Sequence, residues 1–395
     1  MTGVQTCALP ILAHYVYDIF GATDVRIGKK KASKTGKKVR IERGTDEKNL
    51  KAVGEQHPIL LRITSAIISY REARKATGTY FNFKQYKGRL LYSLNPFGTE
   101  SGRLASSESH MWCGTQIQNF PVYAKYQLMA DKGFLLVEND NSKSEAHCVS
   151  VISGDETMMK TLRSERDFYK QLGTLMFGIP FEEVSEEFRN KMLKKINHGV
   201  SYVMGATTMI ENATAAEMLK GAARLNVKIT MNKVPKEGEK TLKQFASDCI
   251  EAWHKPFPKV REWYKTLIAR IAATHMTESA LGFTRYFFGN INKDHNIQKS
   301  AIAHEPQNLS VSILNIGFYK VYNLMKRPEN RGKLRLKCQI HDSILYQRVE
   351  DIEEGKRIDA EVLKAMSNNI EVNGIPLIIP VDAGKPTVHW KEETL

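Results

Sequence analysis

Apolar and polar residues follow two different periods along this chain. From position 334 apolar side chains occupy every second position, which indicates a strand, and an apolar run resumes at Ile344 after the pair His341 and Asp342. This pattern predicts a β-turn-β hairpin with an aspartate at its tip. A shorter apolar strand is predicted from Phe134 to Val137. It places Asp140 at its end and is followed by a helix over residues 145–152.

Most other segments show the helical period. Residues 12–95 are predicted to be mostly helical, broken by a basic loop from Gly28 to Lys38, with a helix restarting near Thr45. The irregular, polar segment from Leu91 to Pro121 is a candidate contact loop. Residues 156–290 are predicted to be strongly helical. Their apolar positions include one face made of Phe168, Leu172, Leu175 and Met176, and a long amphipathic run from Leu242 to Ala273.

Composition narrows the class of protein. Fifty-eight Lys and Arg residues against 43 Asp and Glu residues give a net charge of +15, which suits a polyanionic partner such as nucleic acid. The five cysteines form no CxxC pair, so neither a zinc module nor a disulfide framework is expected, and a reducing cytoplasm fits. No apolar run reaches the roughly 20 residues that would span a bilayer, so no membrane partner is expected.

The first residues differ in character from the rest. Residues 1–11 resemble the translated read-through of a sequencing-library adapter, and they are excluded from the prediction of the fold. We therefore expect the natural protein to be longer at its N-terminal end.

Two carboxylate motifs carry the candidate chemistry: DNSKSEA, which begins at Asp140, and QIHDSILY, which contains Asp342. Two divalent ions about 4 Å apart need carboxylates from separate segments, one ion activating the attacking oxygen and the other stabilising the leaving oxygen. Asp140 and Asp342 are therefore candidate ligands of two Mg²⁺ ions at a phosphoryl-transfer site. A single aspartate at a strand end is more often a cap or turn residue.

A polar stripe is predicted on the helix after Phe188. Its side chains recur every four residues, which places them along one helical face. The stripe consists of Asn190, Lys194, His198 and Tyr202. Lys194 could pair with triphosphate oxygens and Tyr202 could present its ring to a base. Without other motifs, a solvated helix face would be the simpler interpretation.

Together these motifs resemble those of the family A (polymerase I-like) DNA polymerases, in a divergent form of the sort that phages carry. DNSKSE resembles the first catalytic motif, KKINHGVSYVMG the nucleotide-binding helix of the fingers, and IHDS the third motif. The resemblance implies that Asp140 and Asp342 bind the metals and that His341 positions the primer end. It implies that the incoming dNTP is bound by Glu145, Arg189, Asn190, Lys194, His198 and Tyr202.

Further matches extend the resemblance from about Leu12 onward. SGRL at 101–104 and QNFP at 118–121 are similar to signatures that hold primer and template, which implies such roles for Arg103 and Asn119. Gln307 resembles a palm glutamine that touches the duplex. The segments that resemble the thumb and the C-terminal end of the palm are His57–Pro58, Tyr70–Glu72 with Lys75, and Val381–Gly384 with Trp390.

The resemblance implies an α+β polymerase right hand with an antiparallel palm sheet and helical fingers. Residues 12–95 would form a partial thumb, 96–155 and 299–395 the palm, and 156–298 the fingers. The expected reaction is template-directed addition of dNTPs to a primer 3′-hydroxyl, in the cytoplasm of the host cell if the gene is a phage gene. Partners would be primer-template DNA and dNTPs. The sequence does not identify a processivity factor.

Four positions depart from the family pattern. Asn190 stands where an arginine usually lies one turn before the lysine, with Arg189 adjacent. Val203 replaces a glycine after the tyrosine, Tyr169 replaces a histidine that helps hold the triphosphate, and Ser343 replaces the glutamate that commonly follows the His-Asp pair.

Two other functions are compatible with these motifs. Single-subunit RNA polymerases often have HDS in the third motif, as this chain does. Glu145 argues against them, because they typically have glycine at that position, where DNA enzymes place a bulky side chain that excludes a 2′-hydroxyl. An inactive, basic duplex-binding protein descended from a polymerase is the other alternative.

Overall fold

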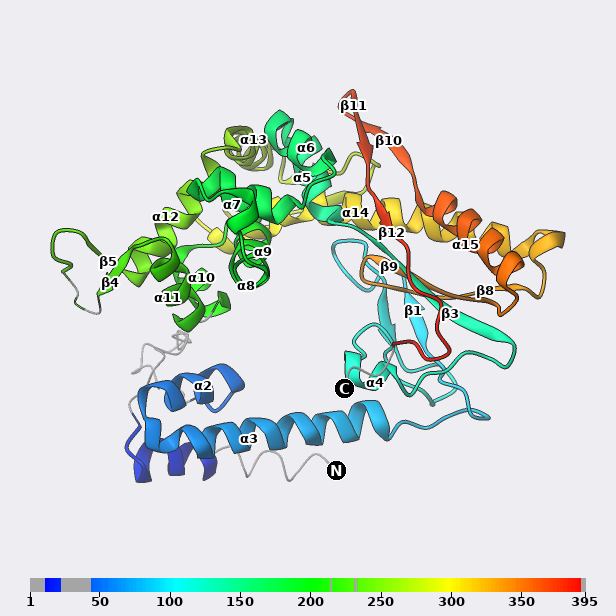
Figure 1. The fold of residues 1–395 in the computed structure, drawn as a ribbon, viewed down its shortest axis with the longest axis horizontal. Coiled ribbons are helices and arrows are strands. Elements are labelled where there is room, and N and C mark those ends of the chain that lie inside the picture. The colour runs from blue at the N-terminus through cyan, green and yellow to red at the C-terminus, as the bar shows by residue number, and fades with distance from the viewer. Residues whose placement is uncertain (1–10, 23–43, 214, 231, 233, 392–395) are drawn as a thin grey trace. The chain divides into compact units, whose positions relative to one another are not determined.

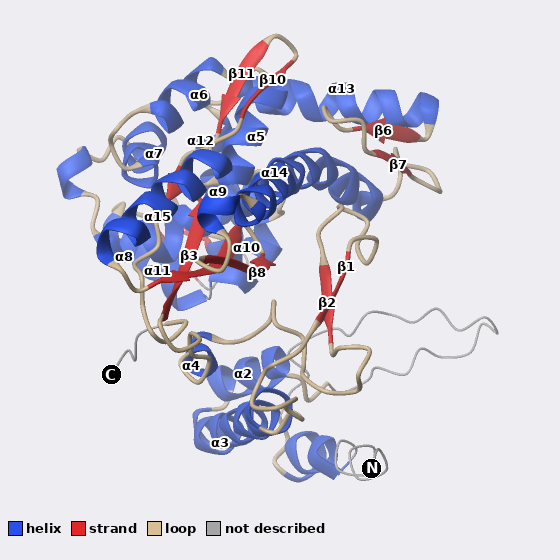
Figure 2. Ribbon diagram, turned by 90° about the vertical axis from the view of Figure 1, so that its right-hand side faces the viewer, coloured by secondary structure: helices blue, strands red, loops and turns tan. Residues whose placement is uncertain are grey.

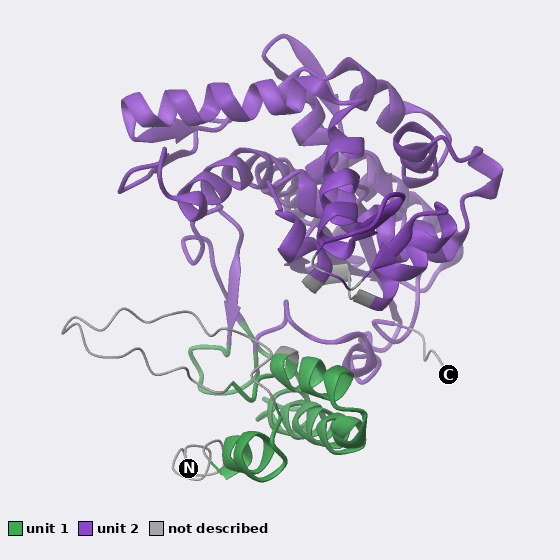
Figure 3. Ribbon diagram, turned by 90° about the vertical axis from the view of Figure 1, so that its left-hand side faces the viewer, with its two compact units in different colours: residues 1–92, 108–115 green, residues 93–107, 116–395 purple. Residues whose placement is uncertain are grey.

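The computed structural model describes residues 11–22, 44–213, 215–230, 232 and 234–391. Residues 1–10 and the basic loop Gly28–Lys38 lie outside this part of the chain. Contacts divide the chain into two compact units, coloured separately in Figure 3. One unit comprises residues 1–92 and 108–115, and the other comprises residues 93–107 and 116–395.

The first unit is helical. Its elements are η1 (His14–Ile19), α2 (Glu47–Gln56), α3 (Pro58–Ala76) and η2 (Thr77–Phe81). The Asp46 side chain accepts a hydrogen bond from the Asn49 N–H and so caps α2, close to the helix start predicted at Thr45. A small core packs Val16 and Tyr17 against Leu50.

The prediction of helix as far as residue 95 is wrong beyond Phe81. Lys87 and Gly88 both have positive φ values, and they form a tight turn in which Tyr86 and Arg89 exchange backbone hydrogen bonds. Two consecutive left-handed residues cannot continue a right-handed helix.

An antiparallel sheet of four strands, in the order β12-β3-β9-β8, organises the second unit (Figure 1). Its strands are β3 (Phe134–Asn141), β8 (Leu334–Ile340), β9 (Ser343–Val349) and β12 (Val381–Asp382). The predicted hairpin is β8 and β9, joined by His341 and Asp342. Asp140 pairs with Ser343 on one side and with Asp382 on the other. The register therefore brings three segments that are far apart in the sequence together at one end of the strands.

Two long helices, α14 (His295–Lys326) and α15 (Ile352–Met366), pack on this sheet. The shared core includes Val137, Leu314, Tyr346, Ile358 and Val362. Two short strands, β10 (Asn369–Val372) and β11 (Ile375–Ile378), form a hairpin whose turn residues Asn373 and Gly374 both have positive φ. An Asn-Gly pair between apolar residues is a strong hairpin signal, and the sequence interpretation missed it.

A second, larger core joins the helices between residues 144 and 274. They are α5 (Ser144–Ser153), α6 (Glu156–Arg163), α7 (Phe168–Phe177), η3 (Phe181–Glu183), α8 (Glu186–Phe188), η4 (Arg189–Leu193), α9 (Lys194–Val200), α10 (Ala206–Ala213), α11 (Ala215–Arg224), α12 (Leu242–His254) and α13 (Pro258–Thr274). Phe168 and Leu172 are buried in this core as predicted, but Leu175 is 40% exposed. The run predicted from Leu242 to Ala273 is two helices, because Pro258 starts a new helix at its first position.

Short elements complete the second unit (Figure 2). They are β1 (Ser93–Asn95), β2 (Ala105–Ser107), α4 (Val122–Lys125), β4 (Lys228–Thr230), β5 (Glu239–Thr241), β6 (Met276–Glu278), β7 (Thr284–Tyr286) and η5 (Pro328–Asn330). Strands of three residues are too short to show a period in the sequence. The α+β class predicted from the sequence is confirmed. Within the described residues, no helix combines the length and apolar character needed to cross a bilayer.

Candidate active site

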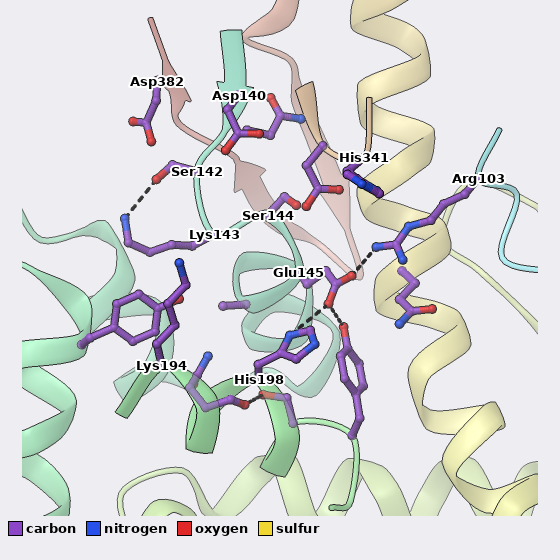
Figure 4. A pocket seen from close by; sticks show the side chains of 18 of the residues that line it. Arg103, Asp140, Ser142, Lys143, Ser144, Glu145, Lys194, His198, His341 and Asp382 are labelled. Atoms are coloured by element: carbon purple, nitrogen blue, oxygen red, sulfur yellow. Dashed lines mark hydrogen bonds and ion pairs between the residues drawn. The ribbon is translucent and has the colours of Figure 1, made fainter. Parts of the chain in front are cut away.

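A pocket of about 590 Å³ opens in the second unit where the edge of the sheet meets α5, α9 and α14. Figure 4 shows its side chains. The pocket is lined by Arg103, Asp140, Asn141, Ser142, Lys143, Ser144, Glu145, Ala146, Tyr169, Arg189, Lys194, Asn197, His198, Ser201, Tyr202, Gln307, His341, Asp342 and Asp382.

Three aspartates from three elements form the acidic side of this pocket. Asp140 lies near the end of β3, Asp342 lies in the β8–β9 turn, and Asp382 lies opposite Asp140 on β12. His341 adopts the left-handed conformation, with φ of +48°, which lets two residues connect the strands. The hairpin thus presents His341 and Asp342 to the same pocket as Asp140.

Burial and neighbouring carboxylates raise the pKa values of Asp140 and Asp342. Burial, and then the charges of Asp342, Glu138 and Asp382, raise the pKa of Asp140 to about 6. Burial and the charge of Glu145 raise the pKa of Asp342. Carboxylates held close together against this repulsion favour binding of a divalent cation.

The donor set fits Mg²⁺, which prefers carboxylate oxygens and retains water or phosphate oxygens in its coordination sphere. Among the described residues, no group of three or more His, Cys, Asp and Glu side chains is arranged to enclose a metal. Magnesium at phosphate-binding sites typically takes one or two carboxylates from the protein and keeps water or phosphate oxygens.

The polar stripe after Phe188 is only partly as predicted. Lys194, His198 and Tyr202 line the pocket, whereas Asn190 is exposed outside it and Arg189 lines the pocket instead. Residues 189–193 form a π-helical turn, in which the Lys194 N–H bonds to the carbonyl of Arg189, five residues earlier. This wider turn puts Arg189, rather than Asn190, on the face of Lys194. The spacing of four assumed an uninterrupted α-helix, which the π turn contradicts.

Arg189 is held by an acid that the sequence interpretation missed. Its Nη2 and Nε lie 2.6 and 3.0 Å from Oδ2 of Asp167, and its Nη1 donates to Oδ1 of Asn190 at 2.6 Å. The guanidinium lies 5.3 Å from the ring centre of Tyr169, which stands at the position of the family histidine. Tyr169 therefore packs against the arginine.

Glu145 lies at the centre of a polar network. Its carboxylate accepts hydrogen bonds from Nη2 of Arg103, at 2.5 Å, and from the hydroxyl of Tyr202. Nδ1 of His198 lies 3.8 Å from Oε2 of Glu145. The side chain of Glu145 is only 16% exposed. The network connects the loop that carries Arg103 to α5 and to the end of α9.

Two aromatic side chains hold the end of α9. Nε1 of Trp253 donates to Oδ1 of Asn197 at 3.1 Å, and the hydroxyl of Tyr264 donates to the carbonyls of Val200 and Ser201. Tyr202 follows in a turn rather than in the helix predicted for it. Val203 has φ of +57°, a left-handed conformation that suits glycine and costs a β-branched residue more.

The remaining predicted residues differ in placement. Gln307 of α14 lines the pocket. Asn119 is exposed and is absent from the lining, and its Nδ2 donates to Gln116 at 3.1 Å. Lys143, Asp167 and Asp382 were not singled out from the sequence, although Asp382 lies in the VDAG segment already compared with the palm.

The fold is similar to that of a solved structure described as the "POL domain of Pol1 from M. smegmatis complex with DNA primer-template and dNTP". The TM-score is 0.71 at 19% sequence identity, and the match covers 95% of this chain and 60% of that one. This similarity defines the fold as an α+β polymerase fold. The family model described as "DNA polymerase family A" matches residues 22–392, so the chain belongs to that family. The family expected from the sequence motifs is confirmed.

Curated relatives agree with this assignment. The chain is 26% identical to "DNA polymerase I, thermostable" of Thermus aquaticus over 377 residues, which is 92% of this chain and 39% of the relative. It is 24% identical to "DNA polymerase I" of Helicobacter pylori strain J99 over 388 residues, which is 93% of this chain and 38% of the relative. The chain thus spans about two fifths of the length of these relatives.

Proposed function

We propose that this chain is a DNA-templated DNA polymerase that adds dNTPs to a primer 3′-hydroxyl and releases pyrophosphate. In this proposal residues 12–95 form a partial thumb, 96–155 and 299–395 the palm, and 156–298 the fingers. The observation that supports it best is the distribution of charge in one pocket. Asp140, Asp342 and Asp382 line the same pocket as Lys143 and Lys194. A metal-bound triphosphate needs both kinds of group.

Asp140 and Asp342 would hold two Mg²⁺ ions, which would activate the attacking hydroxyl and stabilise the charge on the leaving oxygens when bound. The chain's own residues orient the reactants around them. Lys194 would place its charge against the triphosphate, where negative charge develops as pyrophosphate leaves. His341, beside Asp342 in the β8–β9 turn, would position the primer end.

The sugar and base of the nucleotide would contact Glu145 and the side chains that surround it. Hydrogen bonds from Arg103 and Tyr202 hold this carboxylate in position, so it could not move away freely from a 2′-hydroxyl. A ribose would have to displace or crowd a largely buried charged group, which is costly. This arrangement favours deoxynucleotides. His198 and Tyr202 would flank the base, and Arg189 would line the triphosphate side with its charge balanced by Asp167.

The primer-template duplex would be bound by residues around this pocket. Arg103 and Gln307 line it from a loop and from α14. Asn119 is proposed as a further duplex contact outside the pocket. Asn190, also outside the pocket, would act on the nucleotide only through its hydrogen bond to Arg189.

Primer extension tests the proposal. The purified chain, with a primed template, Mg²⁺ and four dNTPs, should extend the primer in the order that the template dictates, and EDTA should stop it. Salt-sensitive DNA binding without extension would identify an inactive duplex-binding protein. Extension with rNTPs but not with dNTPs would identify an RNA polymerase. Either result would overturn the proposal.

A further inference from the structure

The pocket contains six cationic or imidazole side chains, and their partners divide them into two groups. Arg103 is paired with Glu145, and His198 lies within 4 Å of the same carboxylate. Arg189 is paired with Asp167, and each of its three nitrogens already donates to a side-chain oxygen. The charges of these arginines are therefore largely balanced within the protein.

Two lysines of the pocket differ from these arginines. Across the described part of the chain, neither Lys143 nor Lys194 has a carboxylate oxygen within 4 Å of its amine. Within the described residues, the amine of Lys143 donates only to the hydroxyl of Ser142, at 3.1 Å. In Figure 4 both lysines lie on the side of the pocket away from Arg103. Two uncompensated amines thus face a space bordered by three aspartates.

Lys143 also occupies an unusual backbone position. It has φ of +51° and ψ of +33°, in the left-handed region, and it is the residue that precedes α5. Lysine rarely adopts this conformation, and residues held in sparsely populated conformations cluster at functional sites. The conformation occurs between the metal aspartate and Glu145, in the segment that turns from β3 into α5.

The charge of Lys143 acts on the triphosphate side of the pocket. Burial raises the pKa of Asp167, but the hydrogen bond from Arg189, and more weakly the charge of Lys143, lower it overall. Lys143 lines the same pocket as Lys194 and as Arg189, the partner of Asp167.

We propose that Lys143 is a nucleotide-binding residue that pairs with the β- or γ-phosphate of the incoming dNTP, alongside Lys194. This inference rests on the proposed polymerase function. A triphosphate carries about four negative charges, and the two metal ions share their positive charge with the aspartates. Because Arg189 is paired with Asp167, Lys143 and Lys194 are, among the described residues, the two cations without a carboxylate partner on the side of the pocket away from Arg103. Tyr169 stands where the family has a histidine that helps hold the triphosphate, and its ring carries no positive charge. Lys143 would supply a positive charge to the triphosphate instead.

Equilibrium binding of a dNTP tests the role of Lys143 without requiring catalysis. The protein is bound to a primer-template whose primer ends in a dideoxynucleotide, and dCTP opposite a template dG is titrated in Mg²⁺. Lys143→Gln should raise the dissociation constant of dCTP by 10- to 100-fold, whereas Lys143→Arg should stay within about threefold of wild type. Binding of dCMP, which has neither the β- nor the γ-phosphate, should weaken much less than binding of dCTP.

Two further variants separate charge from conformation. Lys143→Gly removes the amine but suits the left-handed backbone, so it should lose dCTP affinity as Lys143→Gln does. Lys160→Gln removes the same charge from an exposed position on α6 outside the pocket and should bind dCTP as wild type does. In extension assays, Lys143→Gln should raise KM for dNTPs and change kcat by less than about threefold.

The inference is wrong if Lys143→Gln and Lys143→Gly bind dCTP within twofold of wild type. It is also wrong if dCTP and dCMP lose affinity equally, since that outcome indicates a structural role. A wild-type protein that binds dCTP but never extends a primer would instead contradict the proposed polymerase activity, so the two failures are distinguishable.

Discussion

Ser343 donates a hydrogen bond from its hydroxyl to Oε1 of Glu138 across the β3–β9 pair, at 2.8 Å. Ser343 stands where the family commonly has a glutamate, and Glu138 is its diagonal neighbour on the facing strand. The carboxylate of Glu138 also accepts from Nε1 of Trp390 at 2.9 Å and pairs with Lys391 at 3.0 Å. Burial raises the pKa of Glu138, but Lys125, Ser343 and Lys391 lower it overall. The carboxylate of Glu138, on β3, thus lies next to the β9 position at which the family commonly has a glutamate.

This relationship predicts a compensating pair of substitutions. Ser343→Glu alone should place a second carboxylate against Glu138 in a mostly buried position. We expect it to lower the free energy of unfolding by about 2 kcal/mol and to reduce primer extension, because both charges cannot be satisfied. The double variant Glu138→Ser with Ser343→Glu should recover most of both losses. Thermal unfolding measures the change in stability, and extension rates at saturating dNTP measure the change in activity.

Ser343→Ala is the control for that experiment. It removes one donor and leaves Trp390, Lys391 and Lys125 in place, so the expected loss is about 1 kcal/mol. A double variant no better than Ser343→Glu would show that the two positions are not coupled.

Removing either metal aspartate should separate binding from chemistry. Asp140→Ala and Asp342→Ala should abolish primer extension and leave duplex affinity nearly unchanged, because each removes a metal ligand rather than a phosphate contact. Gel-based extension and fluorescence anisotropy measure the two properties. The surface variant Asp248→Ala is the control. Extension within about tenfold of wild type, a barrier change of only ~1.4 kcal/mol, would contradict the assignment.

Glu145 should determine the choice of sugar. Glu145→Ala removes the carboxylate that Arg103 and Tyr202 hold, and it opens space near the position expected for the ribose. Ribonucleotide incorporation should rise by roughly a hundredfold, which corresponds to a few kcal/mol of lost discrimination, while dNTP use falls less. Competition between paired dNTP and rNTP substrates measures this ratio. If Glu145→Ala and the exposed control Glu156→Ala discriminate equally between dNTP and rNTP, a residue other than Glu145 excludes the ribose.

His304 should destabilise the protein in acid. This α14 side chain is 1% exposed, neither ring nitrogen has a hydrogen-bond partner among the described residues, and the rings of Phe283 and Phe287 lie 5.7 and 6.4 Å away. Burial, and then the charge of Arg285, lower its pKa to about 4. The unfolded state therefore binds more protons than the folded state between about pH 6.5 and 4, so stability falls as pH decreases through this window.

His304→Leu should remove that contribution. At pH 7 the variant should be about as stable as wild type, and near pH 4.5 it should be more stable by about 2 kcal/mol. Urea unfolding across this pH range compares the two proteins, and all other titrating groups are common to both. The exposed His295→Gln is the control. If the free energy of unfolding depends on pH in the same way for wild type and His304→Leu, the prediction is wrong.

The sequence predicts the parts of the fold that have a clear period. The β8–β9 hairpin could be predicted because its apolar residues alternate and the polar pair His341 and Asp342 interrupts them. The helix after Asp140 could also be predicted, because the apolar residues of that segment do not alternate strictly. The four pairs of short strands could not, since three or four residues cannot establish a period, and only the Asn-Gly turn of β10–β11 left a readable signal.

Site residues could be predicted where they belong to a sequence motif. They were harder to predict where their place in the pocket depends on how separate helices pack. Asp140, Glu145, Lys194 and Asp342 line the pocket as the motifs imply. The partners of Arg189 and the exposure of Lys143 to the pocket depend on packing among separate helices, which no local pattern encodes. The backbone of Val203 keeps a left-handed conformation although no glycine is present to reveal it.

The π turn before Lys194 has a consequence for finding related genes. A search pattern that requires arginine four positions before the fingers lysine rejects this chain, whereas one that also allows five positions accepts it. Both spacings deliver a guanidinium to the same face of a helix, since one additional residue in the turn absorbs the difference. Divergent genes that such patterns discard for lacking the arginine should therefore be re-examined with a one-residue gap at this point.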